Sequence, residues 1–287
     1  MKKTKLGIDK ILTISLPKRQ DRRDKFQSRF NFLDFSFVDG VVGSKLDISK
    51  LLKDKTLNKV QYDPMGSVNK GVIGCSLSHL RCWEIFQESG DEICLILEDD
   101  AIITKPLVEI TTNEQNEGVI KTSKYWIEMW EQLQSLDWDV IYLGKKEKFV
   151  DGVDVTSLFC KPFWMAGMFG AHSYLINKKS VGKLIKQFKP IKYAVDVFLD
   201  LMIEEMNVYA LKESLFRQET DIYLHDTVDL KKVDSDTYHN DNEQGNFTKV
   251  KVDDIVESVE FINYPTSKEY TDKRWPPLIK LNLRLKN

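Results

Sequence analysis

Short apolar runs alternate with amphipathic stretches along most of this chain. Between residues 11 and 212, segments with an apolar residue every three or four positions separate runs of strand length, which occur at 11–16, 35–38, 93–98, 138–144 and 208–211. A period of two or a continuous short apolar run indicates a strand, and a period near 3.6 indicates a helix. Strands that alternate with helices predict a single α/β domain.

The amphipathic stretches define the expected helices. Asn177 is placed to cap one of them, and a further helix is expected over 194–206. The segment 44–70 is expected to be a surface loop, about 104–124 a polar insertion, and 163–175 a strand interrupted by glycines. The apolar faces of the other helices carry Phe26, Phe30 and Leu33; Leu77, Leu80, Trp83 and Phe86; Ile127, Trp130, Leu133 and Leu136; and Val181, Leu184, Ile185 and Phe188.

The character of the chain changes near residue 226. Residues 226–254 are dense in charge and poor in apolar residues, which favours irregular structure. Farther on, Ile279, Leu281, Leu283 and Leu285 alternate with polar neighbours, as in a strand or a packing arm. The sequence therefore predicts a domain over 1–225 and a charged C-terminal extension over 226–287 that packs on or beside it.

Composition narrows the class of protein. Of 287 residues, 42% are hydrophobic and 30% charged, as in ordinary globular proteins, and the net charge of −2 argues against a nucleic-acid binder. The apolar stretch 11–16 ends at Pro17 without a cleavage-like site, and no 18-residue apolar run occurs. We therefore expect neither a signal peptide nor a membrane span.

The four cysteines are expected to be small core residues. Cys75, Cys82, Cys94 and Cys160 form no C-x-x-C pair, which disfavours zinc ligation and thioredoxin-like chemistry. Unpaired cysteines of this kind are typical of the cytoplasm or another reducing compartment.

The most informative segment is the apolar run 93–97, which stops at Glu98, Asp99 and Asp100. In open α/β sheets ligands collect at the carboxyl ends of strands, where these acids fall. Adjacent carboxylates disfavour one another's ionisation unless a cation is near, and such hard oxygen ligands suit Mg²⁺ or Mn²⁺. The alternative is a strand that simply leaves the core through a polar turn.

Two further clusters could hold an anion. The basic segment 17–23 follows the first strand, and arginine forks match phosphate oxygens, although a solvated helix start explains it as well. In 70–79, Gly71 and Gly74 are expected to precede a helix whose N-terminus favours anions. His79 would lie one turn inside that helix, facing a ligand or buried in the core.

Asp196 and Asp200 lie four residues apart at the start of an expected helix. An acid in this position is stabilised by the helix dipole, which is the structural explanation. The functional explanation is a general base that deprotonates an acceptor hydroxyl.

Together these segments resemble glycosyltransferase family 25, and within it the collagen galactosyltransferases more than the bacterial lipopolysaccharide enzymes. The similarity covers about residues 11–225. The blocks that carry it are 14–23, Val38-Asp39-Gly40, 70–79, Glu98-Asp99-Asp100, 138–146, 174–184 and 195–199. The chain departs from the family at Val72, where the family has glutamate, and we expect neither the second domain nor the retention tail of the animal enzymes.

The resemblance implies a GT-A-like fold, α/β with a mixed central sheet flanked by helices, and a UDP-sugar donor, galactose before glucose. It implies Mn²⁺, or Mg²⁺, on Glu98 and Asp100, and Asp196 as the base of an inverting transfer. Trp138 and Trp164 would be sugar platforms or core residues. The implied donor-binding residues are Ile14, Leu16, Arg19, Arg23, Asp39, Gly40, Lys70, Gly71, Gly74, Ser76, His79 and Asp99.

The resemblance leaves the acceptor open. It could be hydroxylysine of a collagen-like protein, or a saccharide of the lipopolysaccharide type. In another class, the chain would be an inactive sugar- or collagen-binding module of the same fold. A metal-dependent phosphotransferase is disfavoured because no Walker loop is present.

Overall fold

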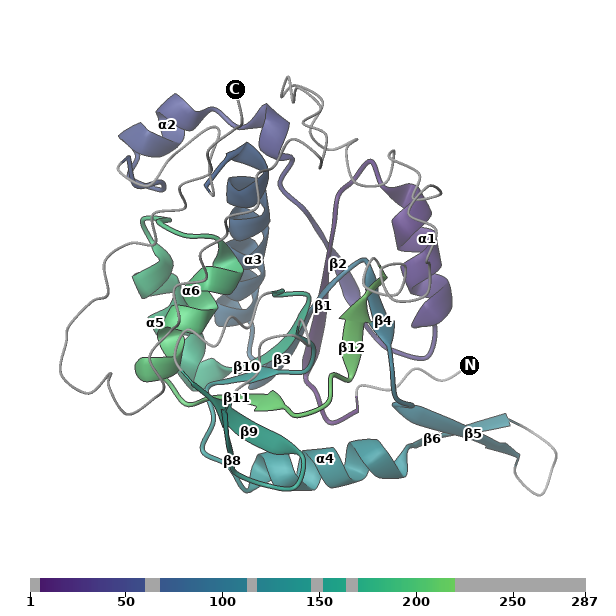
Figure 1. The fold of residues 1–287 in the computed structure, drawn as a ribbon. Coiled ribbons are helices and arrows are strands. Elements are labelled where there is room, and N and C mark those ends of the chain that lie inside the picture. Colours follow the sequence, from purple (N-terminus) through teal and green to yellow (C-terminus); the bar gives the residue numbers. More distant parts are fainter. Residues whose placement is uncertain (1–5, 60–67, 113–117, 146–151, 164–169, 220–287) are drawn as a thin grey trace, which may run out of the picture. The chain divides into compact units, whose positions relative to one another are not determined.

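The computed structural model describes residues 6–59, 68–112, 118–145, 152–163 and 170–219. Its centre is an eight-stranded sheet with the strand order β2-β1-β3-β10-β7-β11-β9-β8 (Figure 1). The strands are β1 (Lys10–Ser15), β2 (Ser36–Asp39), β3 (Ile93–Glu98), β7 (Val140–Tyr142), β8 (Gly152–Asp154), β9 (Phe159–Pro162), β10 (Ser173–Asn177) and β11 (Val208–Leu211).

The strand directions make the sheet mixed. β1 is parallel to both β2 and β3, with Ile14 opposite Val38 on one side and Glu98 on the other. β10 is antiparallel to β3 and β7, whereas β11 is parallel to β7. The carboxyl ends of β1, β2 and β3 therefore meet at one edge of the sheet. The prediction of an α/β fold with a mixed central sheet flanked by helices is confirmed.

Helices cover both faces of the sheet (Figure 1). Ile96 of β3 belongs to the core beneath one group of helices, and its neighbours Leu95 and Leu97 to the core beneath the other. A strand covered on both faces needs apolar residues at consecutive positions, which explains the unbroken run in β3. The first group comprises α3 (Lys70–Glu88), α5 (Lys178–Phe188) and α6 (Val195–Leu201), and the second α1 (Gln20–Arg29) and α4 (Lys124–Gln134).

Two segments for which no helix or strand was predicted contain regular structure. In 44–70, η1 (Gly43–Lys45) is followed by α2 (Ile48–Lys53), which begins because the Asp47 side chain accepts the backbone N–H of Lys50. In 104–124, β5 (Val108–Thr112) and β6 (Gly118–Thr122) form an antiparallel hairpin. The remaining elements are β4 (Ala101–Ile103), paired with β12 (Phe216–Gln218), and η3 (Met202–Glu204).

Most helices lie where the pattern placed them. The Asn177 side chain caps α5 by accepting the N–H of Ser180, as predicted. The predicted helix over 194–206 ends at Leu201 and continues as η3. The face predicted for α4 is right in part: Leu133 is buried and Trp130 and Leu136 pack against the same core, but Trp126 and Met129 are also buried. Ile127 is 45% exposed.

The expected strand over 163–175 is displaced. β10 begins only at Ser173, and residues 164–169 lie outside the described residues. Trp164, the predicted domain boundary and the extension over 226–287 lie outside them too. Trp138 is 8% exposed and belongs to the core.

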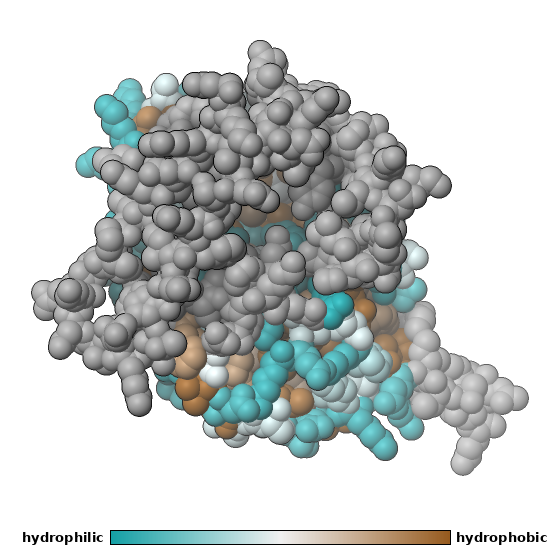
Figure 2. Space-filling view, viewed as in Figure 1, coloured by the Kyte–Doolittle hydropathy of each residue, from teal (hydrophilic) through white to brown (hydrophobic). Residues whose placement is uncertain are grey.

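None of the helices within the described residues combines the length and the apolar character needed to cross a bilayer. In Figure 2, hydrophobic and hydrophilic residues are interspersed over the part of this face that the described residues form. The large hydrophobic side chains exposed among the described residues are Ile127, Val153, Val155 and Phe163.

Candidate active site

A cleft of about 250 Å³ opens at the carboxyl ends of β1 and β3, and we call it the strand-end cleft. Its walls come from the end of β1, the first turn of α1, the loop after β2, the start of α3 and the end of β3. Parallel strands deliver these segments to one edge, which is where α/β sheets bind ligands. The lining residues are Ile14, Ser15, Leu16, Arg19, Arg22, Gly40, Val41, Val42, Gly43, Gly71, Cys75, Ser78, Glu98 and Asp99.

Seven residues that the sequence nominated line this cleft, namely Ile14, Leu16, Arg19, Gly40, Gly71, Glu98 and Asp99. The other nominated residues, which are not among its lining residues, are Arg23, Asp39, Lys70, Gly74, Ser76, His79, Asp100 and Asp196. The seven lining residues can therefore touch a ligand in the cleft.

The three consecutive acids have three different environments. Glu98 accepts from His79 Nε2 at 3.2 Å and from Gln218 Nε2 at 3.5 Å. Asp99 Oδ1 lies 3.2 Å from Arg22 Nη1. One buried oxygen of Asp100, Oδ1, has no hydrogen-bond partner among the described residues. The three carboxylates therefore do not converge on a single point.

The protonation of these acids follows from their surroundings. Burial raises the pKa of Asp100 to about 7, and the charge of Glu98 adds to the rise while Arg22 opposes it. Burial also raises the pKa of Asp99, against its hydrogen bond with Ser15 and the charge of Arg22. Burial likewise acts to raise the pKa of Glu98, but the His79 hydrogen bond and nearby positive charge leave it lowered.

Glu98 and Asp100 fit a hard divalent cation. The side chain of Glu98 keeps 22% of its surface exposed at the cleft, and Asp100 has an unmatched buried oxygen. Mn²⁺ and Mg²⁺ commonly take one or two carboxylates and complete their shell with substrate phosphates and water. A bound cation would also favour the ionised form of Asp100.

A buried chain of hydrogen bonds holds Glu98 in place. Trp83 Nε1 donates to the Tyr174 hydroxyl at 2.9 Å, and that hydroxyl lies 2.9 Å from His79 Nδ1. Because Glu98 has a lowered pKa and is ionised, His79 Nε2 carries the proton and donates it to Glu98. His79, nominated as a donor contact, is fully buried and acts through Glu98 instead.

The arginines of the basic segment after β1 have different roles. Arg19 lines the cleft and pairs with Asp21, whose pKa falls to about 2 because of the Arg19 hydrogen bond. Arg23 donates to the Ser15 carbonyl at 3.0 Å and to Asp39 at 2.6 Å, so it joins the ends of β1 and β2.

The cleft residue that sequence analysis missed in this segment is Arg22, which faces Asp99. Its spacing from Arg19 was the available signal, because residues three apart share a helix face.

The start of α3 differs from its prediction. Gly71 and Gly74 lie inside the helix, and His79 lies in its middle rather than one turn inside. The N–H groups of Gly71 and Val72 donate to the Asn69 side chain, so these two donors of the helix N-terminus are already satisfied.

Gly74 instead allows α3 to pack closely against the loop after β2. A Cβ at Gly74 would lie 2.6 Å from the Val41 carbonyl oxygen. Ser78 Oγ secures the same contact, because it donates to the Gly74 carbonyl and accepts the N–H of Val41 at 2.8 Å. Ser76 is buried, and its hydroxyl has no partner among the described residues.

Asp196 lies in the first turn of α6, where its carboxylate accepts the N–H of Val197 at 2.8 Å and that of Gly170 at 3.4 Å. α6 packs into the same core as α3, so Asp196 lies on a helix that neighbours the one carrying Cys75. Asp200 is more deeply buried, at 6% exposure.

Cys75 corrects the expectation that all four cysteines are core residues. Its side chain is exposed at the strand-end cleft, because the start of α3 forms one wall, whereas Cys82, Cys94 and Cys160 are buried. None of the four forms a disulfide.

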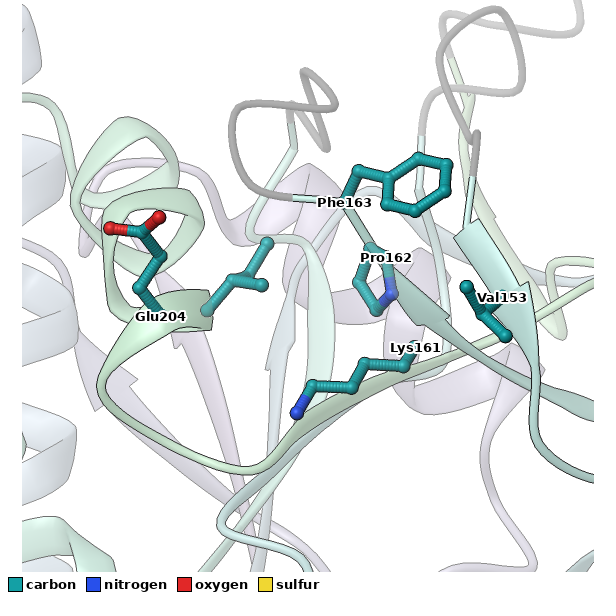
Figure 3. A pocket seen from close by; sticks show the side chains of 6 residues that line it. Val153, Lys161, Pro162, Phe163 and Glu204 are labelled. Atoms are coloured by element: carbon teal, nitrogen blue, oxygen red, sulfur yellow. The ribbon is translucent and has the colours of Figure 1, made fainter. Parts of the chain in front are cut away.

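A larger hollow of about 580 Å³ lies on the β8–β9 hairpin beside η3. Figure 3 shows Val153, Pro162 and Phe163 along the hairpin, with Glu204 across from them. β9 is four strands from β3 in the sheet, a separation of about 19 Å at the usual strand spacing. This hollow therefore lies away from the acids that follow β3.

The fold and the strand-end cleft define a GT-A-like protein, with acids at the carboxyl edge of a mixed sheet. The model of glycosyltransferase family 25, described as an LPS biosynthesis protein, matches residues 8–199, and the chain belongs to this family.

Procollagen galactosyltransferase 1-B of Xenopus laevis is 30% identical over 207 residues, which are 66% of this chain and 32% of the relative. Inactive glycosyltransferase 25 family member 3 of Homo sapiens is 27% identical over 215 residues, 70% of this chain and 33% of the relative. The chain thus spans about a third of the length of the curated relatives it matches.

This chain has a distant similarity to solved structures. The galactosyltransferase LgtC, in complex with donor and acceptor sugar analogs, aligns with a TM-score of 0.33 at 10% identity and covers 70% of this chain and 72% of its own.

Proposed function

We propose that this chain is a metal-dependent, inverting hexosyltransferase that moves galactose, or less readily glucose, from a UDP-sugar to an acceptor hydroxyl. One observation carries the proposal: Glu98, Asp99 and the arginines of α1 line the strand-end cleft, and Asp196 is on α6, which packs against the helix α3 that forms one wall of this cleft. Nucleotide-sugar transfer needs these three elements, namely a charge for the diphosphate, a cation site and a base.

The donor lies along the end of β1 and the Asp39–Gly40 turn. Gly40 N donates to the Ser15 carbonyl at 2.8 Å, which fixes the turn against β1. A Cβ at Gly40 would approach Leu16 Cδ2 to 3.2 Å, so a side chain at this position would crowd the wall of the cleft. Arg19 and Arg22 face the diphosphate from the first turn of α1, where a guanidinium matches phosphate oxygens.

Glu98 and Asp100 would hold Mn²⁺, with Mg²⁺ as the second choice. When bound, this ion supplies charge neutralisation for the departing diphosphate. Asp99 is engaged by Arg22, which leaves its two neighbours for the cation. The Trp83–Tyr174–His79 chain orients Glu98, as outer-shell partners orient metal ligands.

Asp196 is the general base. Its carboxylate takes the proton of the acceptor hydroxyl while the acceptor oxygen bonds to the anomeric carbon of the hexose. The bond between that carbon and the diphosphate oxygen breaks on the opposite face, so UDP leaves and the configuration inverts. The N–H groups of Val197 and Gly170 orient the carboxylate for this step.

The favoured acceptor is hydroxylysine of a collagen-like protein, because the curated relatives include procollagen galactosyltransferases. A saccharide acceptor is the alternative, since the family description refers to LPS biosynthesis.

An inactive binding module is the second candidate, and the human relative named as inactive favours it. Against it stand Glu98, Asp100 and Asp196, which provide a complete set of carboxylates for metal binding and proton transfer.

A radiochemical assay separates these functions. The chain is incubated with labelled UDP-galactose or UDP-glucose and Mn²⁺, together with hydroxylysine-containing peptides or simple saccharides. Transfer to the peptide, lost with EDTA and in Asp100→Asn, supports the collagen-type proposal, and transfer only to a saccharide supports the alternative. Absence of both transfer and donor hydrolysis, in protein that binds UDP with Mn²⁺, would leave the binding module.

A further inference from the structure

Three side chains of different chemistry meet at one wall of the strand-end cleft. Cys75 and His79 are four residues apart on α3, so they share a helix face, and Glu98 ends the adjacent strand β3. One ligand atom from each, Sγ, a ring nitrogen and a carboxylate oxygen, lies within 4.8 Å of the other two. Among the described residues this is the one group of at least three such side chains that meets this distance.

The separation between two of the atoms suits a tetrahedral metal ion. His79 Nε2 lies 3.2 Å from Glu98 Oε1. Two ligands on tetrahedral zinc, each at about 2.0–2.2 Å from the ion, are about 3.3–3.5 Å apart. An ion could therefore replace the proton between these atoms with small side-chain movements.

The surroundings provide both support and access. His79 is fully buried, and its other nitrogen, Nδ1, faces the Tyr174 hydroxyl at 2.9 Å. Ligating histidines are usually oriented by such a partner on the second nitrogen. Cys75 is exposed and lines the cleft, so an ion can enter from solvent and keep an open coordination position there.

We propose that Cys75, His79 and Glu98 form a binding site for Zn²⁺ or a similar borderline or soft cation. Thiolate and imidazole ligands select such ions over Mn²⁺ and Mg²⁺, which prefer oxygen. The site shares Glu98 with the proposed Mn²⁺ centre, so Zn²⁺ withdraws Glu98 from that centre and weakens Mn²⁺-dependent UDP binding. Only this inhibitory consequence rests on the proposed function.

Binding requires a defined proton balance. The Cys75 thiol releases its proton to solvent and binds as thiolate. His79 remains neutral but moves its proton from Nε2 to Nδ1, where the Tyr174 oxygen can accept it alongside the proton from Trp83.

Cobalt provides a direct probe that does not depend on turnover. The metal-free chain is titrated with Co²⁺, and we expect a thiolate-to-cobalt charge-transfer band together with visible d–d bands, both removed by added Zn²⁺. Cys75→Ser should lose the charge-transfer band, and Glu98→Gln or His79→Gln should weaken Co²⁺ binding by at least about 10-fold. Cys160→Ser is the matched control and should leave the spectrum unchanged, since Cys160 is buried on β9.

The result that overturns the site is a folded wild-type chain without a thiolate band, or a band that persists in Cys75→Ser. A band in wild type whose affinity is unchanged by Glu98→Gln would also overturn it, because Glu98 would then not be a ligand. If the thermal melt shows that His79→Gln does not fold, the Co²⁺ affinity of Glu98→Gln is the deciding measurement. A positive cobalt result without sugar transfer would uphold the site and reject the proposed function.

Discussion

Arg22 and Asp99 form an ion pair that joins the first turn of α1 to the turn after β3, with Arg22 Nη1 3.2 Å from Asp99 Oδ1. The Asp99 side chain is 8% exposed and the Arg22 side chain 26%. The pair places the positive charge of Arg22 beside Asp99, one of the three adjacent acids. Arg22 also lines the cleft. There its positive charge opposes the rise in the pKa of Asp100 that burial and the charge of Glu98 cause.

We therefore expect Arg22→Ala to impair both folding and donor binding. The mutation leaves Asp99 buried without its cation, which should cost about 1–3 kcal/mol of unfolding free energy, and it should weaken UDP binding. Urea unfolding and UDP titration with Mn²⁺ measure the two effects. Lys25→Ala is the matched control, because Lys25 is on the same helix and largely exposed. Equal effects of the two mutations would contradict the role given to Arg22.

Arg19 and Arg23 should respond differently to the same substitution. Arg19→Ala should raise the donor KM and keep the Tm within a few degrees, as for a surface cation. Arg23→Ala removes the hydrogen bonds to Ser15 and Asp39, so it should lower the unfolding free energy by about 1–3 kcal/mol. Steady-state kinetics and thermal melts of both variants test this. A destabilised Arg19→Ala with normal KM would reverse the assignment.

Asp100 should make metal-free stability depend on pH. Burial raises its pKa from 3.8 to about 7 in the folded state, so folding favours the protonated carboxyl. Its contribution is fully present below about pH 4 and is lost as pH rises toward 7. In EDTA, Asp100→Asn should therefore match wild type at pH 4 and exceed its Tm at pH 7.5. Asp99 and Glu98 are common to both proteins, so the difference in Tm reports Asp100 together with its interaction with Glu98.

The same variant tests the metal assignment. Mn²⁺ should raise the Tm of wild type at pH 7.5 but not that of Asp100→Asn, and the variant should lose sugar transfer. Near-normal turnover of Asp100→Asn would reject Asp100 as a metal ligand.

Asp196→Ala should lower kcat by at least roughly 10²-fold, the lower end for loss of a general base. UDP affinity with Mn²⁺ should stay within about threefold, which is under 1 kcal/mol. Asp154→Ala is the control, because Asp154 is an exposed acid on β8 that pairs with Lys212. Loss of UDP binding in Asp196→Ala, with kcat retained at saturating donor, would move the base elsewhere.

Local sequence signals predicted much of the architecture. β1, β3 and β11 lie within a residue or two of the predicted runs, and Asn177 caps α5 as expected. These elements depend on nearby residues, either a short apolar run or a capping side chain. Ile127 shows where periodicity fails as a predictor of burial. Its position in the pattern predicted a buried side chain, but its neighbour Trp126 is buried instead and donates a hydrogen bond to the Leu6 carbonyl. The hairpin β5–β6 was missed because its polar composition resembles a loop.

The sequence by itself determined the alternation of strands and helices, the family, and the acids that follow β3, because each is encoded in contiguous residues. The tertiary structure decided which side chains share the cleft. Arg22 meets Asp99 across 77 positions of sequence, and His79 meets Tyr174 across 95. Such contacts arise only when the sheet brings separate strand ends together, so local spacing could not assign His79 to Glu98, or Cys75 to the cleft.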